Sequence, residues 1–170
     1  MEQKAIEQPL VTGGKFTFEL VRGGKVIDTW EDDNLVVNEG LNSLLNVYLG
    51  ATAKESTWYV ALFEGNYTPV ASLTAATFAA AATESTAYTE ATRPEWVDAP
   101  STTQQITNTA SKATFTINDT KTMYGAALIS DNVKGGTAGV LFAASRFSVA
   151  RQVVAEDQLL VTYTVQAASA

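Results

Sequence analysis

Short segments in which apolar and polar residues alternate are the feature that most restricts the fold of this chain. In Lys15–Val21 the alternation places Phe16, Phe18 and Leu20 on one side of a strand, and Leu159–Val165 repeats the pattern. At least seven such segments follow one another at spacings of roughly 8 to 12 residues, without the strand–helix alternation of a parallel sheet. The sequence therefore predicts a mainly β fold, an antiparallel β-sandwich or jelly-roll-like domain.

Turn residues and strand composition give more local predictions. Arg22–Lys25 contains two adjacent glycines, which adopt the positive φ angles of a tight hairpin turn without steric cost. We therefore expect Val26–Trp30 to return as the partner of the preceding strand. Trp58–Phe63 is almost continuously apolar, which indicates a strand buried on both faces. Ala113–Ile117 and Tyr124–Ser130 are expected to run out and back around a polar turn.

One short helix is expected near residues 38–50. Asn38 can cap the free backbone N–H groups at its start, and Gly50 can take a left-handed exit at its end. The apolar residues of this segment recur at helical spacing, and they are Leu41, Leu44, Leu45, Val47, Tyr48 and Leu49. We interpret the helix as a cover over one face or end of a sheet. The Ala-, Thr- and Ser-rich stretch 71–92 is expected to be a loop with a short strand or a turn of helix.

The length of 170 residues suits one domain, because a chain of this size buries roughly 70% of its unfolded surface. We divide it into an N-terminal arm, residues 1–14, and a single β-sandwich domain, residues 15–170. The arm is polar and is interrupted by Pro9, so it buries little by itself and is expected either to stay mobile or to become ordered against a partner. Pro9 and Leu10 are the candidate contact residues of this arm. Its first nine residues lack the basic start and apolar run of a secretory signal.

Composition excludes several classes of chemistry. The chain has no histidine and no cysteine, which rules out disulfides, thiolate nucleophiles, Ser-His-Asp catalysis and the usual zinc sites. Eleven basic residues stand against 18 acidic ones, so the formal charge is −7 and no basic cluster offers phosphate neutralisation. The most strongly apolar stretches are too short to cross a bilayer. We therefore predict no catalytic residues, no cofactor, no metal, no nucleic-acid binding and no membrane insertion.

Two chemical alternatives have some support in the residues. The acidic run Glu31–Asn34 could offer oxygens to calcium, but it lacks the ligand spacing of a calcium loop and is more typical of a solvated bend. Glu90, with Glu95 or Asp98, lies in a tryptophan-containing stretch that could evoke a sugar cleft. No spacing rule supports a pair of catalytic carboxylates there. We interpret this loop instead as a protein contact.

Four residues of that loop, Arg93, Pro94, Glu95 and Trp96, are the remaining candidate partner contacts. The prolines of the segment bias their predecessors away from helix, which predicts an extended connection. A mixed loop of this kind more often mediates a protein contact, since arginine and aromatic residues are enriched in interfaces, or else packs its ring onto its own domain. We expect the loop to be exposed.

Five runs of the sequence resemble a group of small virion proteins of tailed bacteriophages. The runs are Trp58–Gly65, Tyr88–Trp96, Ser111–Phe115, Lys134–Thr137 and Gln158–Val165. The likeness covers most of the chain from about residue 16 onward and contains no catalytic motif. What the resemblance implies is a structural component of the phage particle, on the head or on the tail.

Three functional hypotheses follow from the residues and the resemblance together. The preferred one is a capsid decoration, or cement, protein that contacts the major capsid protein or other virion proteins and forms a homo-oligomer, with a trimer as one form that suits capsid symmetry. It would be assembled in the host cytoplasm and reside in the virion. The second is a tail-associated adaptor at the tail tip, collar or fibre. The third is a sugar-binding module or glycosidase that uses Trp58, Trp96 and nearby acids.

Overall fold

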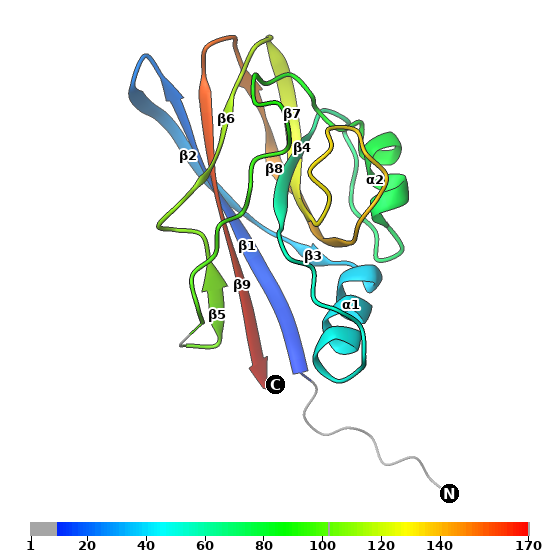
Figure 1. The fold of residues 1–170 in the computed structure, drawn as a ribbon. Helices are drawn as coiled ribbons and strands as arrows, with labels where there is room; N and C mark the ends of the chain where they lie inside the picture. The colour runs from blue at the N-terminus through cyan, green and yellow to red at the C-terminus, as the bar shows by residue number, and fades with distance from the viewer. Residues whose placement is uncertain (1–9, 102, 170) are drawn as a thin grey trace, which may run out of the picture.

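The fold consists of two antiparallel sheets with two short helices (Figure 1). It is described here from a computed structural model, which describes residues 10–101 and 103–169. The elements are β1 (Leu10–Arg22), β2 (Lys25–Asp33), β3 (Leu35–Val36), α1 (Asn38–Tyr48), β4 (Tyr59–Phe63), α2 (Ala75–Ala82), β5 (Gln105–Thr107), β6 (Ala113–Thr116), β7 (Lys121–Ile129), β8 (Leu141–Val153) and β9 (Gln158–Ser169). The predicted β-sandwich with a short helix near residues 38–50 is confirmed.

Each sheet has its own strand order. The first sheet runs β2-β1-β9-β5, with β6 also paired to β9, and the second runs β3-β8-β7-β4. The predicted hairpin is confirmed, because Gly23 (φ 56°) and Gly24 (φ 75°) form the turn between β1 and β2. The expected pairing of Ala113–Ile117 with Tyr124–Ser130 is wrong, because β6 pairs with β9 and β7 pairs with β8. The polar turn between them carries the chain from one sheet to the other.

The strand β1 begins earlier than expected. It pairs with β9 from Leu10 opposite Ser169 to Val21 opposite Gln158. Residues 10–14 therefore belong to the sheet, and the predicted arm is wrong in that part, because the long β9 supplies backbone partners for the extra residues. Residues 1–9, including Pro9, lie outside the described residues.

Apolar side chains fill two layers of core. The larger cluster lies between the sheets and includes Phe16, Phe18 and Tyr163, while the smaller one includes Phe78 of α2. The strand β4 contributes to both, since Val60 and Leu62 belong to the larger cluster and Ala61 and Phe63 to the smaller. Its predicted burial on both faces is confirmed.

The helix α2 lies within the stretch 71–92, expected to be a loop with a short strand or a turn of helix, and at eight residues it is longer than that single turn. Thr74 and Thr77 form a reciprocal capping box at its start, and Phe78 is fully buried in its middle. Alanine propensity, a cap and one aromatic anchor are together sufficient for two turns of helix. No helix in residues 10–101 and 103–169 is long and apolar enough to cross a membrane.

Candidate protein-binding surface

The guanidinium of Arg93 is fully buried, contrary to the exposed contact expected from the sequence. Its Nε and Nη2 donate to the two carboxylate oxygens of Glu84 at 2.8 and 2.7 Å. Nη1 donates to the backbone oxygen of Asp131 at 2.7 Å, and Nη2 also donates to that of Gly136 at 3.1 Å. Burying this charge is tolerated because nearly every donor is used. Arg93 therefore holds three distant segments together and is not free to meet a partner.

The rest of the predicted contact loop is divided between core and surface. Trp96 is 5% exposed, and its Nε1 donates to the backbone oxygen of Tyr163 at 2.9 Å. Pro94 is partly buried and accepts a hydrogen bond at its carbonyl from the backbone of Val60 at 2.9 Å. Glu95 is exposed. The expected exposure of the loop is thus wrong for Arg93 and Trp96, because the loop packs along the edge strand β4.

Acidic side chains near the strand ends also have internal partners. Asp157 accepts two hydrogen bonds of 2.7 Å from Arg22, and this contact holds the pKa of the Asp157 carboxyl below its ordinary value despite burial. Asp32 accepts from the backbone N–H of Ser148 at 2.8 Å. In the described ranges no group of three or more acidic side chains is arranged to hold a metal ion.

The helix α1 is packed with its small residues inward. Gly40 is buried directly against the backbone of Phe142, so close that a Cβ atom at this position would collide with it. Ser43 and Val47, three and seven residues later, lie on the same side and are partly buried. The helix packs against β8, in agreement with the expectation that it covers one face or end of a sheet, but of the predicted apolar stripe only Val47 is partly buried on this side. The close approach permitted by glycine decides which side docks.

The caps of α1 also differ from those expected. Val37 occupies the N-cap position, and Asn38 is the first helical residue without a side-chain cap. The chain leaves at Leu49 in the right-handed region, so Gly50 makes no left-handed exit. The carboxylate of Glu39 instead fixes the start of α1, because its Oε2 accepts from the backbone of two other segments.

The outward face of α1 is apolar and exposed. Its members are Leu41 (36% exposed), Leu44 (38%), Leu45 (51%), Tyr48 (84%) and Leu49 (76%). We call these five side chains the α1 face. They have the i, i+3, i+4, i+7, i+8 spacing of a helix that docks against another surface. The sequence shows that one side of the helix is apolar, but it does not show whether that side faces the protein's own sheet or the solvent. The small residues Gly40 and Ser43 were the signal in the sequence that the adjacent side of the helix is the one that packs closely against the sheet.

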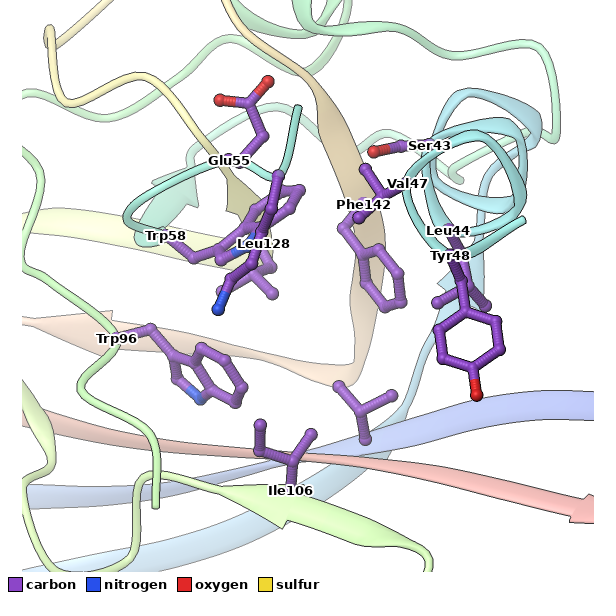
Figure 2. Close-up of a pocket in the computed structure, with 12 residues that line it drawn as sticks. Ser43, Leu44, Val47, Tyr48, Glu55, Trp58, Trp96, Ile106, Leu128 and Phe142 are labelled. Atoms are coloured by element: carbon purple, nitrogen blue, oxygen red, sulfur yellow. The ribbon is translucent and has the colours of Figure 1, made fainter. Parts of the chain in front are cut away.

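A groove adjoins the α1 face and runs beneath it (Figure 2). Its volume is about 270 Å³. Trp58 and Phe142 meet edge to face at 5.8 Å, and Trp96, Ile106 and Leu128 complete most of the apolar wall. Figure 2 shows these rings and branched side chains around one hollow, with α1 along its edge.

Polar groups in this groove are few. Ser43, Lys54 and Glu55 contribute them, in addition to the Tyr48 hydroxyl at the edge. The carboxylates expected in a sugar cleft are not brought there, since Glu90 accepts from the backbone N–H of Thr116 at 3.0 Å. The groove and the α1 face together are suited to bury apolar surface of another molecule.

Comparison of the chain with protein-family models found no matching family, and comparison with curated protein sequences found no match.

Proposed function

We propose that this protein is a structural component of a tailed-bacteriophage virion, namely a capsid decoration protein that binds the head shell through non-covalent contacts. The observation that carries the proposal is the exposed α1 face beside an apolar groove, because it supports a protein that works by contact with other protein chains of the virion, copies of itself included. Soluble monomers rarely expose a contiguous apolar patch of this kind unless it binds something. The resemblance of five sequence runs to phage virion proteins supports the choice of the virion as the setting.

Basic side chains of this protein are paired with its own acidic side chains. This pairing supports binding of a partner through complementary shape rather than through charge. Within residues 10–101 and 103–169, six basic side chains form ion pairs, and they are Lys15, Arg22, Arg93, Lys112, Lys121 and Arg151. With a formal charge of −7, the remaining surface is unfavourable to a nucleic-acid backbone. The partners we propose are therefore proteins, with the major capsid protein first among them.

Apolar contact suits a protein that holds other proteins together, because burial of apolar surface stabilises a complex without any chemical reaction. Each Å² of apolar surface removed from water contributes roughly 25 cal/mol, and repetition over a symmetric shell multiplies a modest contact. The protein would act without a catalytic group, a cofactor or a metal.

Copy number in purified particles tests this proposal. Quantitative mass spectrometry of the phage that encodes the chain is expected to find it in hundreds of copies, because a decoration protein follows the symmetry of the shell. A few copies, up to a few dozen, would replace decoration with the tail-associated adaptor. Particles that contain none of the chain would refute both.

A sugar-binding module remains the alternative from another class, and one observation favours it. Trp58 and Trp96 line the same groove, and aromatic platforms bind sugar rings. The scarcity of polar groups there favours the protein partner, because a sugar site needs several convergent hydrogen-bonding groups. Glycan-array binding that is lost on Trp58→Ala would establish this alternative in place of the proposal.

A further inference from the structure

We propose that the α1 face is covered by a second copy of this chain, with Tyr48 and Leu49 of each copy seated in the groove of the other. We rest this on the proposed function only in assigning the surface to protein contact. It adds the identity of the occupant and leaves other faces of the molecule for the shell.

Charge favours a second copy at this place. Two copies that each carry −7 repel one another, so self-association requires a contact region free of net charge. The α1 face has no ionised side chain. The one carboxylate on α1, Glu39, is turned to the backbone N–H groups of Ala75 and Leu141 at 2.8 and 2.7 Å. Of the groove residues, Lys54 and Glu55 have opposite signs. A second copy can therefore approach here without bringing the like charges of the two copies together.

Shape gives a second, independent reason. Tyr48 and Leu49 have the highest exposed fractions among the large apolar side chains of the described residues, and Tyr48 stands at the edge of the groove. A projection next to a hollow is self-complementary, because a two-fold rotation places the projection of each copy over the hollow of the other. The groove volume of about 270 Å³ is also slightly below the usual size of small-molecule sites, roughly 300–1,000 Å³.

Helix geometry agrees with this arrangement. Leu41, Leu44, Leu45 and Tyr48 follow the i, i+3, i+4, i+7 spacing that brings one side of a helix against another. Leu45 lies near the middle of this side, so a two-fold contact between α1 helices places the two Leu45 positions close together. Tyrosine is enriched in protein interfaces because it buries a large ring and keeps its hydroxyl wet at the rim.

Sedimentation of the purified full chain tests the proposal in the absence of any virion. From about 5 to 500 µM, a range that covers weak specific association, the wild type is expected to shift from monomer to a larger species. Leu45→Glu should weaken association at least tenfold, because it buries an unpaired charge in the contact. Val149→Glu is the matched control, since Val149 is 60% exposed on β8 and away from α1. Unchanged circular dichroism verifies that the variants fold.

Salt dependence separates this contact from an ionic one. Raising NaCl from about 0.1 to 1 M screens the repulsion between acidic copies and leaves apolar contact intact, so association should strengthen. Association that is lost at high salt would contradict an apolar contact.

Cross-linking locates the contact. The chain contains no cysteine, so a single Leu45→Cys substitution supplies one thiol per copy. A short bis-maleimide should link Leu45→Cys copies efficiently and Val149→Cys copies poorly. A link that forms equally at both positions would overturn the proposal.

Other occupants have distinct outcomes. A monomeric wild type at all concentrations overturns the proposal, and if removal of residues 1–9 then induces association, the occupant is that segment. Loss of particle binding by Leu45→Glu in a chain that is always monomeric assigns the surface to a shell protein and also overturns it. Self-association together with absence from particles would refute the proposed function alone.

Discussion

Individual charged residues in this protein mainly hold the fold together. The side chains of Arg93 and Glu84 are 0% and 1% exposed, and two hydrogen bonds pair them. A further hydrogen bond, from Arg93 to the backbone oxygen of Asp131, joins this part of the chain, which precedes β5, to the loop after β7. Sequence reasoning could not find this pair, because a mixed-charge loop has the same composition whether its arginine faces solvent or a buried carboxylate. Partners that are distant in sequence, such as Asp131, leave no local pattern.

Glu84→Gln tests the importance of that pair. It keeps the shape of the side chain but removes the buried carboxylate that pairs with Arg93, leaving only the longer contact of 3.4 Å to the Asp131 carboxylate, so the free energy of unfolding should fall by about 3–5 kcal/mol. Urea unfolding followed by tryptophan fluorescence measures the change. Glu31→Gln is the control, because the Lys15–Glu31 pair is exposed and its loss should leave the unfolding midpoint unchanged. Equal effects of the two substitutions would contradict a structural role for Arg93.

The free energy of unfolding should depend on the ionisation of Asp157 at low pH. Its pKa is lowered in the folded protein, chiefly by the hydrogen bond from Arg22, so its contribution is complete above the unfolded value near 3.9. That contribution is lost as pH falls through the depressed folded value. Asp157→Asn should therefore be less stable than the wild type at pH 7, and the difference should shrink as the pH falls below the unfolded value near 3.9. Urea unfolding at a series of pH values checks this, and a difference independent of pH would contradict it.

At the scale of the element, the orientation of α1 is the main departure from expectation. Periodicity predicts that one side of a helix is apolar, but it does not say whether that side meets the protein's own sheet or another molecule. Here the contact with Phe142 requires Gly40, and the larger side chains are directed outward.

Gly40→Ala measures that close contact. In an open helix this change stabilises by up to about 1 kcal/mol, but here the new methyl group meets the backbone of Phe142, and overpacking should cost about 1–3 kcal/mol. Gly13→Ala is the matched control, because nothing lies within 4 Å of a Cβ at that position. Thermal unfolding of both variants shows whether Gly40→Ala raises or lowers the stability of the folded protein. Stabilisation by Gly40→Ala would contradict the packing of α1 described above.

Local chemistry explains which elements could be predicted. The two glycines at 23 and 24 determine a turn by their φ angles alone, and the apolar run Trp58–Phe63 determines burial on both faces of β4. The start of β1 and the pairing of β6 depend on partners in β9 that are more than 40 residues away along the chain. Pairing at such distances leaves no mark on the segment itself. The burial of Arg93 and Trp96 could not be predicted for the same reason, because their partners Asp131 and Tyr163 are also distant in the sequence.

At the scale of the whole molecule, the exposed large apolar side chains of the described residues are most numerous on α1 and at its end, while others, such as Val26, Ile27 and Val149, are scattered over the strands. The helix α2 lies over part of the second sheet (Figure 1), and its Phe78 belongs to the smaller core cluster. The large apolar side chains of α1, by contrast, are exposed. The absence of histidine and cysteine, the internally paired charges and this exposed face together favour a protein that works by contact. Self-association through α1 would then present several copies of the remaining surface to a symmetric shell.

Cryo-electron microscopy of the phage that encodes the chain tests this account most directly. The account predicts copies of this β-sandwich on the outside of the head shell, repeated with the capsid symmetry, with the α1 face buried between neighbouring copies. A shell at residue resolution without this domain would contradict it.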